Sequence, residues 1–181
     1  MWLRELVLKA KLIGFQSHSL TEDRMDPELD SLADPRTNDD VIAAFRAQNG
    51  RVGGMFAGAD LVLLTTRGAR TGLARTTPVA ARHEPDRFLV FATNAGAARD
   101  PAWLLNLRAY PMLEVEAPGV DRVERFAARA VEQSVEESAR LYALQAADDP
   151  AFAAYRERTP RAFPVIALER IDDGSGQRRR A

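Results

Sequence analysis

The sequence predicts a β-rich α+β domain, and three features of its pattern support that class. Several apolar or alternating runs of strand length are separated by short turns that contain Gly or Pro. A few segments with helical periodicity lie among them. Regular β-α-β alternation is missing, which argues against a Rossmann sheet. Periodicity alone leaves both a closed barrel and a sandwich open.

The clearest strand is the apolar, β-branched-rich run Leu61-Val62-Leu63-Leu64-Thr65-Thr66. A hairpin is expected around Glu84-Pro85-Asp86. Leu113 and Val115 alternate with Glu114 and Glu116, which is typical of a half-exposed strand. The predicted strands after the first are residues 76–82, 87–93, 113–116, 120–131 and 163–171.

Helices are predicted from their capping residues. Asn38 is expected to cap a first helix. Asp100 is expected to cap a second, with Pro101 at its first helical position. The capping-box sequence Ser134-Val135-Glu136-Glu137 predicts a third helix, and Asp149-Pro150 predicts a fourth.

Composition limits the function classes. The formal net charge is −1 in 181 residues, so no global field attracts nucleic acid. Cys is absent, which excludes a disulfide framework and thiol chemistry and fits a cytoplasmic location. His18 and His83 lie far apart without partners at ligand spacing, so a metal site is not expected.

Residues 1–16 are amphipathic, with Trp2 on the apolar side and Lys9 and Lys11 among the charges. Charges interrupt the apolar run, which disfavours a signal peptide, and no stretch reaches the roughly 20 residues that span a bilayer. Two interpretations stay open: a helix that packs on the domain or on a second subunit, and a peripheral membrane anchor. We expect residues 1–36 to form this helix and a linker, 37–173 the domain, and 174–181 a disordered tail.

The stretch 61–78 carries the first candidate site. Its strand runs into Arg67-Gly68-Ala69-Arg70-Thr71-Gly72 and returns through Arg75. A Gly-containing turn exposes backbone N–H groups, and Arg70, Thr71 and Arg75 add charge and hydroxyl donors, which suits a phosphate. A surface hairpin with solvated arginines is the alternative from these residues alone.

The stretch 91–111 favours a binding site over a surface hairpin. It reads FATNAGAARDPAWLLNLRAYP, a strand end followed by a Gly/Ala loop and a short helix. Together the two stretches resemble the deazaflavin-dependent nitroreductase family, whose members bind coenzyme F-420. The family pattern TTxGrkSGxxRxxP is matched by residues 65–78, and AS(K/N)GGAxxxPAWyxNLxAxP by residues 92–111. The resemblance runs from about Phe45 to about Ile171.

The resemblance implies a split β-barrel and hydride transfer from reduced F-420 to a quinone, a nitroaromatic compound or another activated acceptor. It implies that Tyr155 faces the acceptor and donates a proton or hydrogen bond. The cofactor residues that it implies are, in order, Arg70, Thr71 and Arg75 at the phosphate, Thr77 and Pro78 at the ring, Thr93, Asn94 and Gly96 in the second loop, and Trp103 and Asn106 as walls. A core role for Trp103, a bracing role for Asn106 and a packing role for Tyr155 stay open.

The sequence also departs from the family pattern. Ala69 stands where a basic residue is usual, and Asn94 where lysine is common. Each lost charge–phosphate contact would weaken binding by about 1 kcal/mol. The alternative function is therefore a non-catalytic carrier or sequestering protein for the deazaflavin, or for FMN as the less favoured cofactor. A homodimer is a further expectation.

Overall fold

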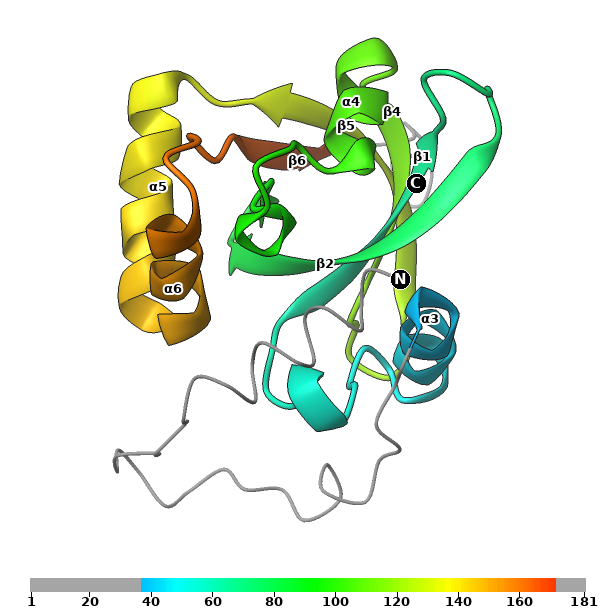
Figure 1. Ribbon diagram of the computed structural model, residues 1–181. Coiled ribbons are helices and arrows are strands. Elements are labelled where there is room, and N and C mark those ends of the chain that lie inside the picture. The colour runs from blue at the N-terminus through cyan, green and yellow to red at the C-terminus, as the bar shows by residue number, and fades with distance from the viewer. Residues whose placement is uncertain (1–36, 172–181) are drawn as a thin grey trace, which may run out of the picture.

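The structure is a computed structural model that describes residues 37–171. These residues form a closed barrel of antiparallel strands in the order β1-β2-β3-β6-β5-β4 (Figure 1). The β-rich α+β class is confirmed, and closure settles the choice between barrel and sandwich. The expectations for residues 1–36 and 174–181 lie outside the described residues. The strands are β1 Leu61–Arg67, β2 Ala74–Glu84, β3 Arg87–Phe91, β4 Met112–Ala117, β5 Glu124–Glu132 and β6 Val165–Arg170.

Most of the strands pair with neighbours in sequence, but two pairings close the barrel. β1 pairs with β4, with Leu64 opposite Val115, and β3 pairs with β6, with Leu89 opposite Ala167. The strand predicted from Val120 begins instead at Glu124. Residues 118–123 form a turn, and the Asn49 amide holds that turn by donating to Gly119 O at 3.0 Å.

Four α-helices surround the barrel in the described region: α3 Asn38–Ala47, α4 Ala102–Ala109, α5 Val135–Asp148 and α6 Pro150–Arg158. Two short 3₁₀ turns, η1 Gly54–Phe56 and η2 Asn94–Gly96, lie between strands and helices. None of the described helices combines the length and the apolar character needed to cross a bilayer.

Two of the predicted N-cap residues lie one position away from the residues that occupy the cap. α3 is capped by Thr37, whose hydroxyl accepts from Asp40 N–H at 3.1 Å while the Asp40 carboxylate accepts from Thr37 N–H at 2.9 Å. Asn38 is thus the first helical residue rather than the cap. At α4 the cap position is Pro101, and the Asp100 carboxylate pairs with Arg108 and Arg161 instead of capping the helix. The Ser134 and Asp149 caps are confirmed.

The barrel interior is the main core, and α4 closes one end of it. Alternate residues of the strands point inward, as Val62 and Leu64 of β1 and Val115 of β4 do. α4 adds Trp103, Leu104 and Leu107 to the same cluster. In Figure 1 this helix lies at the upper end of the barrel beside the turn that joins β1 to β2.

A second, aromatic cluster lies outside the barrel beneath α5 and α6, which run side by side (Figure 1). Phe91, Phe152 and Tyr142 pack with centroid separations of 5.3 to 6.3 Å. The Tyr142 hydroxyl donates to Phe152 O at 2.6 Å, which ties the two helices together. This layer fixes where α6 lies relative to the end of β3.

Glu116 departs from the expected half-exposed strand. Its side chain points away from the barrel interior as predicted, yet it is only 1% exposed because α3 covers that face. Arg46 of α3 donates to it from Nε at 2.8 Å, and Arg125 donates at 3.1 Å. The pair replaces the water that the carboxylate loses and fastens α3 to the barrel.

Candidate functional site

The turn between β1 and β2 carries the first motif. Gly68 N–H donates to Leu73 O at 2.8 Å, and Gly72 N–H donates to Gly68 O at 2.8 Å. Gly72 has φ +70°, a left-handed conformation that favours glycine. The Thr71 hydroxyl accepts from Leu73 N–H at 3.3 Å, so it lies against the turn itself.

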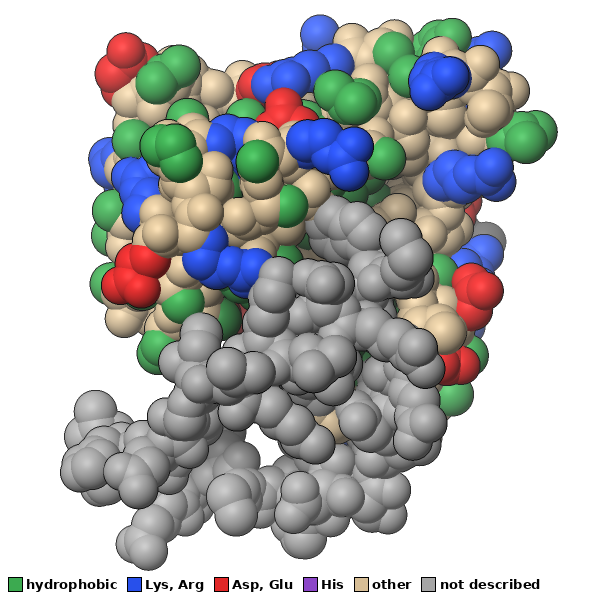
Figure 2. All heavy atoms as spheres, viewed as in Figure 1, with side chains coloured by type: hydrophobic (Ala, Val, Ile, Leu, Met, Phe, Trp, Pro, Cys, Tyr) green, Lys and Arg blue, Asp and Glu red, His purple; other side chains and the backbone are tan. Residues whose placement is uncertain are grey.

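Arg70 on this turn and Arg75 at the start of β2 are exposed, and within residues 37–171 neither forms an ion pair. Arg67 beside them lies over the Tyr110 ring at 4.5 Å. In Figure 2 blue Arg side chains gather on the upper part of the face, over α4 and the turn. Unpaired guanidinium groups in solvent remain available for an anion.

Asn106 connects the first motif to the second. Its Oδ1 accepts from Ala69 N–H at 2.9 Å, and its Nδ2 donates to the Thr66 hydroxyl at 3.0 Å. Both polar groups of the side chain are therefore engaged with the turn and the end of β1. Of the roles left open by the sequence, the geometry favours bracing, but of the turn and not of the loop that precedes α4.

Thr77 and Pro78 lie in the part of β2 that pairs with β1 on one side and is not paired with β3 on the other. β3 pairs with β2 only as far back as Ala81, whereas β1 continues along β2 to Ala74. Ala81 N–H donates to Asp60 O, on the β1 side of β2. Backbone groups of a strand alternate between its two neighbours, so Thr77, four residues before Ala81, also directs its backbone groups toward β1. Thr76 and Pro78 direct theirs to the open edge. The edge thus offers the Thr76 N–H and the Pro78 carbonyl to a ligand.

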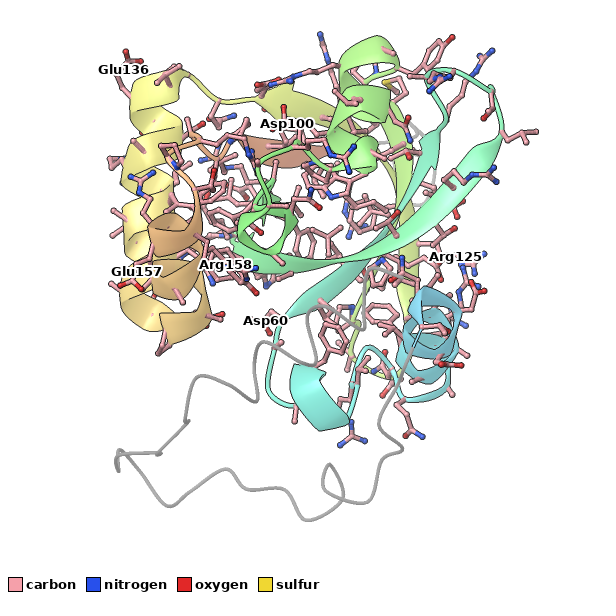
Figure 3. All side chains as sticks on the ribbon, in the orientation of Figure 1. Asp60, Asp100, Arg125, Glu136, Glu157 and Arg158 are labelled. Atoms are coloured by element: carbon pink, nitrogen blue, oxygen red, sulfur yellow. The ribbon has the colours of Figure 1, made fainter. Side chains whose placement is uncertain are left out.

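The second motif forms a loop of residues 92–100 in an unusual backbone conformation. Asn94, Ala95 and Gly96 have φ values of 51°, 50° and 76°, three left-handed residues in succession. A Cβ at Gly96 would lie 3.1 Å from Tyr155 O, so the loop packs closely on α6. Figure 3 shows labelled Arg158 of α6 beside this loop and Asp100 at its far end, before α4.

Asn94 donates from Nδ2 to Arg99 O at 2.7 Å, which closes the loop. Its Oδ1 is buried without a hydrogen-bond partner among the described residues. Buried polar atoms are nearly always paired, and an unpaired one is a candidate for a ligand's donor. Thr93 beside it is 8% exposed.

Arg161 was not found from the sequence, although its guanidinium donates hydrogen bonds to both ends of this loop. Its guanidinium donates to Thr93 O at 2.9 Å and to Ala92 O at 3.1 Å from Nη2. Nε donates to Ala97 O at 3.2 Å, and Nη1 to Asp100 Oδ1 at 2.7 Å. No local pattern distinguishes this arginine from the others, because its partners lie more than 60 residues earlier.

Trp103 and Tyr155 differ in how much they can offer a ligand. The Trp103 indole is 6% exposed and belongs to the barrel core, so its burial favours the core role. Tyr155 is half-buried on α6, and its ring packs on Phe152 at 5.6 Å. Burial, with a smaller contribution from Asp149, raises the pKa of the Tyr155 hydroxyl. The phenol therefore stays protonated at neutral pH and can act as a donor.

The arrangement suits a flat group with an anionic tail. Within residues 37–171 the first motif carries arginines without ion pairs, the second carries a buried acceptor without a hydrogen-bond partner, and α4 joins the two. α4 has eight residues, a length of about 12 Å. Within residues 37–171 no three His, Cys, Asp or Glu side chains gather as metal ligands would.

Comparison with known proteins gives the family. A family model described as F420H(2)-dependent quinone reductase matches residues 37–170. The F420H(2)-dependent quinone reductase Rv1261c of Mycobacterium tuberculosis is 33% identical over 132 residues, which cover 71% of this chain and 86% of that protein. A putative F420H(2)-dependent quinone reductase of Mycobacterium bovis, Mb1292c, matches to the same extent.

Solved structures agree. A structure described as an F420-H2 Dependent Reductase (FDR-A) is 30% identical with a TM-score of 0.52, covering 61% of this chain and 94% of that one. A chain described as a domain-swapped dimer is also 30% identical, with a TM-score of 0.51 and coverage of 61% and 80%. The split-barrel fold and the F-420 resemblance predicted from the motifs are thereby confirmed. The chain belongs to the F420H(2)-dependent quinone reductase family and is an oxidoreductase whose cofactor is coenzyme F-420.

Proposed function

We propose that this chain binds reduced F-420 between the β1–β2 turn and loop 92–100 and uses it to reduce a quinone. The observation that carries the proposal is the double attachment of α4. The helix begins directly after loop 92–100, and its Asn106 holds Ala69 in the turn at 2.9 Å. The two motifs are thus parts of one surface.

In this proposal the cofactor phosphate is held by Arg70 and Arg75, with Thr71 shaping the turn between them. Support comes from the exposure of both arginines and from their lack of ion pairs in the described region. With Ala69 in place of a basic residue, these two side chains and Arg67, which lies over the Tyr110 ring, carry the charge at that end. The deazaflavin ring would border the open edge of β2 at Pro78 and Thr76, while Thr77 between them has its backbone paired with β1.

Loop 92–100 would bound the other side of the ring. Thr93 and Gly96 supply its close-packed backbone, and the unpaired Asn94 Oδ1 would accept a hydrogen bond from a donor on the cofactor. Trp103 would support the site from within the barrel core, and Asn106 would fix the turn. When bound, reduced F-420 supplies a hydride.

Tyr155 would donate a hydrogen bond, and then a proton, to the acceptor oxygen. A phenol is protonated at neutral pH, which is the state that a hydrogen-bond donor needs, and burial raises the pKa of Tyr155 further from that pH. The main chain of Tyr155 lies against Gly96 of the cofactor loop, which brings α6 next to the proposed site.

Oxidation of reduced F-420 by a soluble quinone such as menadione, followed by absorbance, tests the function. Arg75→Ala should raise the KM for F-420 about fivefold, the effect of losing one partly exposed charge–phosphate contact. Arg129→Ala removes an exposed arginine from β5 and is the matched control. Tight binding of F-420 without oxidation by any of several acceptors would instead support the carrier function.

A relative of known structure is described as a domain-swapped dimer, which supports a homodimer; light scattering of the purified chain would decide it. Nitroaromatic compounds belong in the same acceptor series as menadione. Membrane contact through residues 1–16, and with it the choice between a cytoplasmic and a membrane-associated enzyme, is testable by liposome co-sedimentation with and without residues 1–36.

A further inference from the structure

The conformation of loop 92–100 requires an external restraint. Three successive left-handed residues include Asn94 and Ala95, both of which carry a Cβ that disfavours this region. Such backbones persist only where surrounding groups determine them. The bonds within the loop run from Gly96 N–H to Thr93 O, from Ala97 N–H to Asn94 O and from Asn94 Nδ2 to Arg99 O, and none of them attaches the loop to the rest of the protein.

Arg161 supplies that restraint. Its side chain is 17% exposed and lies over the Phe163 ring at 4.8 Å. The contacts described above attach it to both ends of the loop, to Ala92 and Thr93 on one side and to Ala97 and Asp100 on the other. One planar group therefore spans the three left-handed residues and fixes the separation of the flanking carbonyls.

We propose that Arg161 is a positioning residue that sets the backbone of loop 92–100 in the shape that accepts the cofactor. This inference rests on the proposed function for its link to F-420. Arg161 has its donors turned to the protein, so it acts through the loop and not by touching the ligand. A lysine cannot replace it, because an ammonium group lacks the planar set of donors that reaches separated carbonyls.

Arg108 provides a matched control. It is also paired with Asp100, at 3.1 Å, and its second partner is Glu132 of β5. No bond from Arg108 to the backbone of loop 92–100 is among its contacts in the described region. Loss of Arg108 therefore tests the charge on Asp100 without removing the clamp on the carbonyls.

The experiment compares Arg161→Gln, Arg161→Lys and Arg108→Gln with the wild-type chain. Amide hydrogen exchange is measured first in the cofactor-free proteins. Both Arg161 variants should exchange about tenfold faster in residues 92–100, with the barrel strands unchanged. The KM for F-420 should then rise about tenfold while kcat stays within about twofold, and Arg108→Gln should match wild type in both readouts.

Unchanged exchange in residues 92–100 of the Arg161 variants would overturn the proposal, as would an equal effect of Arg108→Gln. Faster exchange throughout the barrel would overturn it too, since that result describes a general stabilising role. If Arg161→Gln does not fold, Arg161→Lys decides, because it retains the positive charge and most of the length. A wild-type chain that binds no F-420 would instead refute the proposed function, and the exchange arm would still decide the role of Arg161.

Discussion

Replacing Asn106 with Ala should weaken both the fold and the cofactor site, because one side chain holds the β1–β2 turn to α4. The change removes an acceptor 2.9 Å from Ala69 N–H and a donor 3.0 Å from the Thr66 hydroxyl. At about 1 kcal/mol for each net hydrogen bond, the free energy of unfolding should fall by about 2 kcal/mol. For a chain of this size that corresponds to a drop in Tm of about 4–8 °C.

Asn106→Asp separates the two bonds. An aspartate still accepts from Ala69 N–H but has no donor for the Thr66 hydroxyl, which is directed at Arg75 O at 3.5 Å, so this variant should lose about half as much stability as Asn106→Ala. Leu105→Ala is the control, because Leu105 is 51% exposed on the neighbouring position of α4. It should leave the Tm within about 2 °C of wild type.

Thermal unfolding by circular dichroism measures the stability, and fluorescence titration with F-420 measures the affinity. We expect Asn106→Ala to weaken F-420 binding several-fold in addition to lowering the Tm. An Asn106→Ala protein with the Tm and the F-420 affinity of wild type would refute the reasoning. Such a result would mean that the turn keeps its shape without α4.

Three further variants test other parts of the structure. Glu116→Gln should lower the free energy of unfolding by about 2 kcal/mol at neutral pH, because Arg46 and Arg125 lose a buried partner. The hydrogen bond from Arg46 is the main cause that lowers the pKa of Glu116, so its contribution holds above the unfolded pKa of about 4.3 and is lost as pH falls through the folded pKa. The variant should therefore show a flatter acid limb in urea unfolding measured against pH. Gly96→Ala places a Cβ 3.1 Å from Tyr155 O at φ +76° and should cost about 1–2 kcal/mol, measured by the same unfolding. Tyr155→Phe should lower kcat about tenfold or more with the KM for F-420 unchanged, whereas equal kinetics would assign Tyr155 to packing alone.

Local signals predicted much of the fold. The apolar run at β1, the Glu84-Pro85-Asp86 hairpin and the Ser134 cap each depend on residues close together in the chain, and the structure contains all three. Barrel closure was not available from periodicity, because β1–β4 and β3–β6 join strands far apart in sequence. Only the family resemblance of the two motifs predicted a barrel.

The errors share a cause, which is competition from distant residues. Asp100 is a good cap by type, but Arg108 and Arg161 hold its carboxylate. Glu116 alternates as a solvent-facing residue does, yet α3 folds over it. Arg161 itself was missed because its role exists only once β6 lies beside the end of β3.

Hydrogen exchange of the wild-type chain with and without F-420 tests the central claim most directly. If the two motifs form one cofactor site, saturating F-420 should slow exchange in residues 67–76 and in residues 92–100 together, with a common dependence on F-420 concentration. Protection confined to one of these segments, or located elsewhere while F-420 binds tightly, would contradict the claim.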